Sequence, residues 1–188
     1  MGKRLMSSAL GRRAVFLDRD GVLNRARVVA GKPYPPETLD AFELLPGVVQ
    51  ACRDLHEAGF LLIVATNQPD VGRGTQDRAV VEAMHEELRR LLPLHAIEVC
   101  YDAGEPSDFL KPEPGMLLRA AHEHQVDLSS SFMVGDRWKD VDCGRSAGCT
   151  TFFVDCGYAE HLRSMPDFTV SNLPEAAKLI LLTNHPRI

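Results

Sequence analysis

Residues 16–24 read FLDRDGVLN, an apolar run that leads directly into two carboxylates, Asp18 and Asp20. A single residue separates the two acids, and anions held so close repel one another unless a cation or a proton intervenes. A continuous apolar run is typical of a strand buried on both faces of a parallel sheet. We therefore expect this strand to deliver both carboxylates to a site where something compensates their charge.

Apolar runs and helical periodicities alternate along the rest of the chain. Predicted strands cover 14–17, 60–67, 96–102, 131–136, 149–155 and 167–172, and predicted helices cover 46–59, 75–92, 113–125, 139–148 and 173–182. Strands that alternate with helices form right-handed βαβ units. The sequence thus predicts an α/β fold, a doubly wound three-layer parallel sheet. The proline-rich stretch 25–45 and the stretch 69–74 are interpreted as loops near its mouth.

Length and composition favour a single ordinary domain. The chain has 188 residues, of which 45% are hydrophobic and 25% charged. We expect one domain over 13–183 and a disordered leader, 1–12. No apolar run approaches the ~20 residues of a membrane span, so we expect a cytoplasmic protein with no membrane partner. The net charge of −5 argues against nucleic acid as a partner, and the oligomeric state stays open.

Polar side chains collect at or just beyond the predicted carboxyl ends of the strands, where open α/β sheets bind ligands. Carboxylates are the oxygen ligands that Mg²⁺ prefers, and Mg²⁺ would offset their repulsion. A carboxylate can also attack phosphorus, while an amine and a hydroxyl stabilise the phosphoryl oxygens. The pattern therefore predicts magnesium-dependent phosphoryl transfer at a site built from Asp18, Asp20, Thr66, Asn67, Gln68, Lys111, Asp136 and Asp140.

Four short motifs occur in a fixed order: DRDGVLN (18–24), TNQ (66–68), KPEPGM (111–116) and GDRWKD (135–140). Together they resemble the motifs of the haloacid dehalogenase-like (HAD) phosphatases over roughly residues 13–182. Within that family they resemble the capless branch that contains heptose 1,7-bisphosphate and histidinol phosphatases. The resemblance implies a Rossmann-like HAD fold with no large cap domain. It also implies hydrolysis of a small phosphate ester of the sugar-phosphate type.

The resemblance also implies a role for each motif position. Asp18 matches the nucleophile that forms an aspartyl-phosphate, and Asp20 matches the acid and base that serves the leaving oxygen and the water. Thr66 and Lys111 match groups that hold the phosphoryl oxygens. The implied magnesium ligands are Asp18, Asp136 and the main-chain carbonyl of Asp20, with Asp140 behind them. Candidate substrate contacts are Gly21, Asn24, Asn67, Gln68, Arg73 and Leu110.

Two departures from the branch bear on cofactor and substrate. The heptose and histidinol enzymes carry a zinc loop before the third motif, but here only Cys100 stands in a plausible position. Four nitrogen or sulfur ligands cannot be assembled there, so we expect no zinc. Leu110 replaces the arginine that precedes the third-motif lysine in the heptose enzyme.

Several other interpretations were weighed against a sugar-phosphate phosphatase. Histidinol phosphate or another metabolite is the alternative substrate within the same fold. A receiver-like phospho-acceptor would store phosphate without turnover, but its acceptor carboxylate follows the third strand rather than the first. An enzyme acting on nucleic-acid ends would need a basic groove. A non-catalytic binding protein does not account for the intact polar set. The seven histidines receive no catalytic role.

Overall fold

Six parallel strands form the centre of the molecule. The computed structural model describes residues 11–104 and 106–183. The strands lie in the order β5-β4-β1-β6-β7-β8. They are β1 (Ala14–Leu17), β4 (Leu61–Asn67), β5 (Ala96–Cys100), β6 (Phe132–Gly135), β7 (Thr150–Val154) and β8 (Phe168–Val170). Every neighbouring pair is parallel, which confirms the predicted doubly wound sheet.

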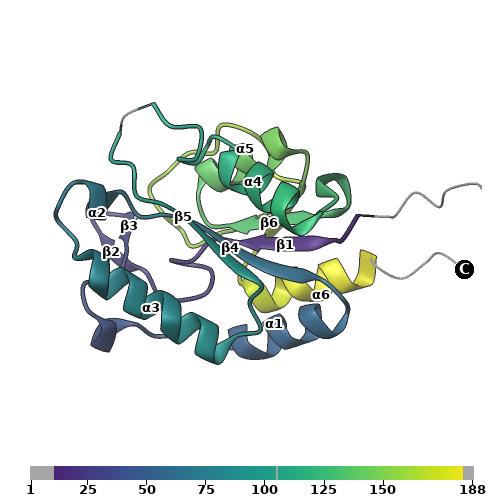
Figure 1. The fold of residues 1–188 in the computed structure, drawn as a ribbon, viewed down its shortest axis with the longest axis horizontal. Coiled ribbons are helices and arrows are strands. Elements are labelled where there is room, and N and C mark those ends of the chain that lie inside the picture. Colours follow the sequence, from purple (N-terminus) through teal and green to yellow (C-terminus); the bar gives the residue numbers. More distant parts are fainter. Residues whose placement is uncertain (1–10, 105, 184–188) are drawn as a thin grey trace, which may run out of the picture.

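Helices cover both faces of the sheet and give the predicted three layers (Figure 1). One face carries α1 (Val48–Glu57), α3 (Arg78–Leu91) and α6 (Leu173–Thr183). The other face carries α4 (Gly115–His124) and α5 (Trp138–Ala147). No helix within residues 11–104 and 106–183 combines the length and apolar character that a membrane span needs.

Strand β1 lies in the interior because its four side chains pack into two hydrophobic clusters, one on each face of the sheet. Val15 and Leu17 belong to the cluster under α1 and α6, whereas Ala14 and Phe16 belong to the cluster under α4 and α5. All four residues are fully buried, as the continuous apolar run predicts. With β4 on one side and β6 on the other, β1 places the residues that follow it at the middle of the sheet edge.

The stretch 25–45 is not a plain loop, and this prediction was wrong. It contains an antiparallel hairpin of β2 (Arg27–Val29) and β3 (Lys32–Tyr34), followed by the short 3-10 helix η1 (Leu39–Ala41). Ala30 and Gly31 form the two-residue connection, both with positive φ, as tight hairpin turns require. Pro33 is tolerated in β3 because a two-stranded ribbon has free edges.

Smaller differences lie at the helix ends and in the connections. The helix expected over 75–92 begins at Arg78, because the side chain of Asp77 accepts a hydrogen bond from the backbone N–H of Ala79 at 2.8 Å. The stretch 69–74 contains a short helix, α2 (Pro69–Gly72). The expected leader lies outside the described residues except for positions 11 and 12, and Arg12 forms a parallel bridge with Val126.

Candidate active site

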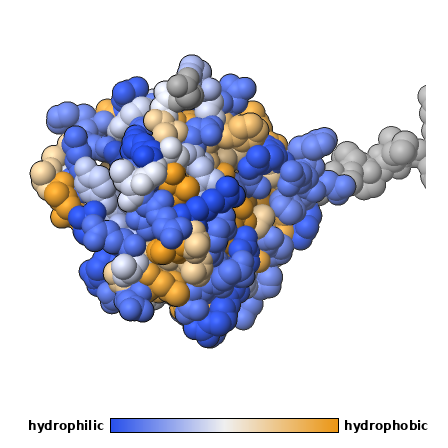
Figure 2. All heavy atoms as spheres, turned by 60° about the vertical axis from the view of Figure 1, so that its left-hand side comes forward, coloured by the Kyte–Doolittle hydropathy of each residue, from blue (hydrophilic) through white to orange (hydrophobic). Residues whose placement is uncertain are grey.

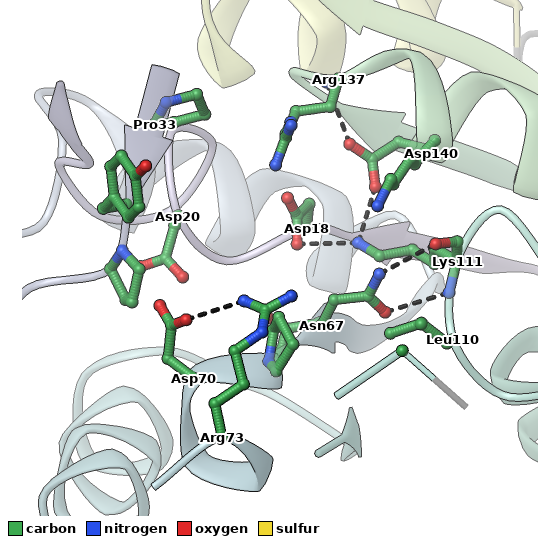
Figure 3. A pocket seen from close by; sticks show the side chains of 16 residues that line it. Asp18, Asp20, Pro33, Asn67, Asp70, Arg73, Leu110, Lys111, Arg137 and Asp140 are labelled. Atoms are coloured by element: carbon green, nitrogen blue, oxygen red, sulfur yellow. Dashed lines mark hydrogen bonds and ion pairs between the residues drawn. The ribbon is translucent and has the colours of Figure 1, made fainter. Parts of the chain in front are cut away.

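A buried lysine connects the ends of three parts of the fold. Lys111 precedes α4, and its Nζ donates to Asp18 Oδ1 at 2.9 Å, to Asp140 Oδ1 at 2.6 Å and to the carbonyl oxygen of Ala65 at 2.7 Å (Figure 3). Asp18 follows β1, Ala65 belongs to β4 and Asp140 lies in the first turn of α5. Three of the predicted site residues are therefore brought into direct contact.

Burial controls the ionisation of this cluster. Burial alone would lower the pKa of Lys111, but the charges of Asp140 and Asp18 raise it above its ordinary value. For Asp18, burial raises the pKa from an ordinary 3.8 to about 6, although Lys111 acts in the opposite direction. Lys111 is thus a permanent cation, and it pairs with two carboxylates at once.

Asp136 is a buried carboxylate that no cation of the described residues pairs with. Both of its oxygens are buried, and among residues 11–104 and 106–183 no hydrogen bond of good geometry reaches either, although the hydroxyl of Tyr158 lies beside this carboxylate and lowers its pKa. Burial, followed by the charges of Asp18 and Asp140, raises the pKa of Asp136 well above its ordinary value. Oxygen atoms of these three acids lie within 4.8 Å of one another. The residues fit a hard divalent cation, which would satisfy the unpaired oxygens.

Glycines allow this close packing of acids. Gly21 has a φ of +88°, and a Cβ there would lie 1.9 Å from Asp136 Oδ2. A Cβ on Gly135 would lie 2.1 Å from the Cβ of Asp140. Gly21 thus faces the carboxylate expected to bind metal. This contact is a reason for glycine that the sequence analysis, which listed Gly21 as a candidate substrate contact, did not give.

Asp140 supports the lysine from behind. Its Oδ1 accepts from Lys111, and its Oδ2 accepts from the backbone N–H of Arg137 at 3.0 Å, at the start of α5. Both oxygens are therefore engaged by this protein's own donors. The motif implies a place for Asp140 behind the metal ligands, and that role stays a prediction.

Three side chains hold Asp20 at the pocket wall. Arg19 donates to both carboxylate oxygens, Asn24 Nδ2 donates to Oδ1 at 2.9 Å, and Gln68 Nε2 donates to Oδ2 at 2.9 Å. Gln68 also donates to the hydroxyl of Thr66 at 2.9 Å. Asn24 and Gln68 are buried and do not line the pocket. The structure therefore places these two expected substrate contacts behind Asp20, because their amides point into the protein.

A pocket of about 270 Å³ opens over these residues. Three of the expected substrate contacts, Asn67, Arg73 and Leu110, line it, and Asn67 also forms two hydrogen bonds of 3.0 Å with the backbone of Lys111. Pro33, Tyr34 and Pro35 also line it, and they come from the stretch 25–45 that the sequence analysis placed near the mouth of the sheet. Arg137 and Lys139 of the α5 region are lining residues that the sequence analysis did not single out. In Figure 3, Arg73 and Arg137 approach the opening over Asp18 from opposite sides.

Comparisons with known proteins agree with this geometry. A family model described as HAD-hydrolase-like matches residues 109–176. A D-glycero-D-manno-heptose-1,7-bisphosphate 7-phosphatase from Thermosynechococcus vestitus is 36% identical over 200 residues, covering 94% of this chain and 99% of that protein. The chain belongs to the HAD-like phosphatase family. It is therefore an enzyme, a phosphoric monoester hydrolase, as the motifs predicted.

Two further HAD-like relatives extend the comparison. A D-glycero-beta-D-manno-heptose-1,7-bisphosphate 7-phosphatase from Escherichia coli K12 is 35% identical over 184 residues, covering 88% of this chain and 93% of that protein. The crystal structure of a D,D-heptose 1,7-bisphosphate phosphatase from B. bronchiseptica, complexed with magnesium and phosphate, has a TM-score of 0.73 at 28% identity. That match covers 91% of this chain and 99% of the other. HAD phosphatases are generally magnesium-dependent, and the acidic cluster described above suits that chemistry.

Proposed function

We propose that this HAD-like phosphatase hydrolyses a small sugar phosphate in a magnesium-dependent reaction, through an aspartyl-phosphate on Asp18. The observation that carries the proposal is the buried triad in which Lys111 bridges Asp18 and Asp140 beside the buried carboxylate of Asp136, which no described cation pairs with. One oxygen of Asp18 accepts a hydrogen bond from Lys111, and the side chain lines the pocket. A nucleophile needs this placement.

Each residue of the site has a separate role in the two steps of phosphoryl transfer. In the first step an Asp18 oxygen attacks phosphorus, the bond from phosphorus to the substrate oxygen breaks, and Asp20 gives that oxygen a proton. In the second step a water oxygen attacks phosphorus, Asp20 takes its proton, and Asp18 is released. Lys111 and the Thr66 hydroxyl stabilise the equatorial oxygens in both steps. Asp18, Asp136 and the Asp20 carbonyl would hold Mg²⁺, which supplies charge neutralisation at the phosphoryl group.

The pocket lining supports a substrate with a second anionic group. Arg73 pairs with Asp70 and Arg137 pairs with Glu160, but Lys139 has no carboxylate partner among the described residues. Its ammonium lies 5.6 Å from the centroid of the Trp138 ring. A heptose 1,7-bisphosphate carries such a second group, and the relatives named for that substrate make it the first candidate. The cations of the lining disfavour the amine of histidinol phosphate.

A phosphate-release screen with Mg²⁺ tests the function. The panel contains both anomers of heptose 1,7-bisphosphate, other sugar mono- and bisphosphates, histidinol phosphate and p-nitrophenyl phosphate. We expect multiple turnovers with a sugar phosphate, at a kcat of about 1 to 10³ s⁻¹ for the best substrate. Stoichiometric labelling without turnover would instead identify a phospho-acceptor protein, and no reaction with any ester would contradict the proposal.

Mutation of Lys139 tests the second anionic site. We expect Lys139→Ala to raise KM for a bisphosphate about 10-fold with little change in kcat, because the interaction is equal in ground and transition states. KM for p-nitrophenyl phosphate, which lacks a second phosphate, should stay unchanged. Lys178→Ala, on the exposed face of α6, is the control. Equal effects on both substrates would show that Lys139 does not bind the second group.

Magnesium should stabilise the protein far more at pH 8 than at pH 5. The folded pKa of Asp18 is raised from 3.8 to about 6, so the metal-free folded state loses stability as pH rises from about 4 to about 6. The raised pKa of Asp136 extends this loss to higher pH. At about 100 times Kd, Mg²⁺ should add about 2.7 kcal/mol at pH 8, roughly 5–10 °C in Tm.

Differential scanning fluorimetry at the two pH values measures this effect. Asp136→Asn should abolish the shift with Mg²⁺ and should leave the metal-free protein more stable at pH 8, because a buried charge is removed. A shift of the same size at pH 5 and pH 8, or one that persists in Asp136→Asn, would exclude this metal site.

The expected absence of zinc stays a prediction, which metal analysis of the purified protein checks.

A further inference from the structure

Arg19 is a fully buried cation that the motif roles do not use. Its side chain has a relative exposure of 0%, and it is among the largest fully buried side chains. Nε and Nη2 both face Asp20, at 3.0–3.3 Å from the two carboxylate oxygens. Nη1 points the other way, 3.2 Å from Nε2 of His85. The guanidinium is therefore held between a pocket residue and a helix residue.

His85 is buried in α3 and presents a lone pair to Arg19. Burial, followed by the charge of Arg19, lowers its pKa to about 4, so the imidazole is neutral at neutral pH. A neutral ring that accepts at Nε2 carries its proton on Nδ1. Nδ1 lies 3.5 Å from Glu82 Oε2, and Glu82 Oε1 accepts from the Tyr101 hydroxyl at 2.6 Å. Glu82 thus favours the tautomer that Arg19 requires.

We propose that His85 is a positioning residue that fixes Arg19 and, through it, the carboxylate of Asp20. The inference rests on the proposed function, in which Asp20 transfers protons at the leaving oxygen. Asn24 belongs to the same loop as Asp20, and Gln68 directly follows β4, which pairs with β1. Arg19 alone of the three described partners of Asp20 is held in turn by α3. A chain of contacts therefore runs from the surface of α3 to the pocket.

The expected consequence is a misplaced proton donor rather than a lost binding site. Without an acceptor at position 85, a buried N–H of Arg19 has no partner, and the guanidinium must shift to find one. Because Arg19 donates to both oxygens of Asp20, the carboxylate moves with it. A displacement of about 1 Å at a catalytic group can cost about 10²-fold in rate. Phosphate binding, which depends on Lys111, should be preserved.

The leaving group of the substrate reports on Asp20 directly. Phenyl phosphate needs a proton on its departing oxygen, whereas p-nitrophenyl phosphate releases a stable anion without one. We expect His85→Leu to lower kcat/KM for phenyl phosphate about 10- to 100-fold and that for p-nitrophenyl phosphate less than about threefold. His85→Gln keeps an acceptor for Arg19 and should restore most of the lost rate. A purely structural defect would lower kcat/KM equally for the two substrates, and the ratio between them would not change.

Two controls make the outcome decisive. Val81→Ala removes buried volume from the same face of α3 without removing an acceptor, and it should leave the ratio between the two substrates unchanged. If His85→Leu does not fold, Glu82→Leu removes the acceptor for His85 Nδ1 at a more exposed position and should shift the ratio in the same direction. An unchanged ratio in an active variant overturns the role of His85. No turnover by the wild-type enzyme with either ester would instead count against the proposed function.

Discussion

Asp18→Asn should abolish phosphatase turnover, with kcat reduced by at least about 10⁴-fold. An amide of the same shape cannot attack phosphorus, and it lacks the charge that Lys111 and a divalent cation would share. Asp140 shares with Asp18 its burial, its place in the pocket lining and its contact with Lys111, but the second oxygen of Asp140 accepts from the backbone N–H of Arg137 and is not free to attack. Phosphate release from p-nitrophenyl phosphate and from the best substrate of the screen, with saturating Mg²⁺, measures the loss.

The matched control for this variant is Asp70→Asn. Asp70 lines the same pocket but pairs with Arg73 on the surface and does not contact Lys111. Its replacement should change kcat by less than about 10-fold, since exposed ion pairs contribute little. Circular dichroism and thermal melting confirm that both variants fold. If Asp18→Asn kept more than about 1% of wild-type kcat, the assignment of the nucleophile would be wrong.

Lys111→Met should damage both stability and rate. The lysine compensates Asp18 and Asp140 at a position that is 2% exposed, so its removal leaves buried negative charge without a partner. We expect the free energy of unfolding to fall by about 3–5 kcal/mol in metal-free protein at pH 8. The folded pKa of Lys111 is raised, so the lysine itself stays protonated throughout the neutral range, and the lower pH limit of its contribution is set by the ionisation of Asp18. Loss of its contact to the phosphoryl oxygens should lower kcat by about 10²- to 10³-fold.

Urea denaturation and steady-state kinetics measure the two effects separately. Lys178→Met, on the exposed face of α6, should change the free energy of unfolding by no more than about 0.5 kcal/mol. The destabilisation of Lys111→Met should shrink as pH falls toward 5, because Asp18, with a pKa of about 6, is then largely protonated. A loss of stability that does not depend on pH would indicate a packing defect rather than uncompensated charge.

The sheet could be predicted from the sequence because its strands are continuous apolar runs with helices between them. Each run ends where polar residues begin, and parallel topology then brings Asp18, Thr66 and Asp136 to one edge. The position of Lys111 followed from its motif, and the structure places its amine on Asp18 at 2.9 Å. The alternation of strands and helices, and the parallel topology that it implies, determine these placements, and both follow from the pattern of residue types.

Directions of side chains in the loops could not be predicted in the same way. Arg19 stands between two acids in a polar segment, where a solvated charge is the ordinary expectation, yet it is fully buried. Gln68 follows β4 like a pocket residue, but its amide reaches Asp20 inside the protein. The hairpin at 27–34 was missed because its strands are only three residues long and include a proline. Tertiary contacts decide all three, and no local periodicity reports them.

On the face that comes forward from the left of Figure 1, apolar side chains form separate small groups among hydrophilic ones (Figure 2). Val28, Val29 and Tyr34 of the hairpin are exposed, and Tyr34 also lines the pocket. The hairpin is therefore a wall of the substrate site in its own right, and variation there should alter which sugar the enzyme accepts.

Chemical trapping of the phosphorylated enzyme tests the central claim most directly. The enzyme is mixed with p-nitrophenyl phosphate and Mg²⁺, quenched within one turnover and reduced with borohydride, which converts an aspartyl-phosphate to homoserine. Peptide mass spectrometry then locates the modified residue. The mechanism proposed above predicts homoserine at position 18 in wild-type protein and none in Asp18→Asn. Modification at another carboxylate, or full turnover with Asp18 never modified, would contradict it.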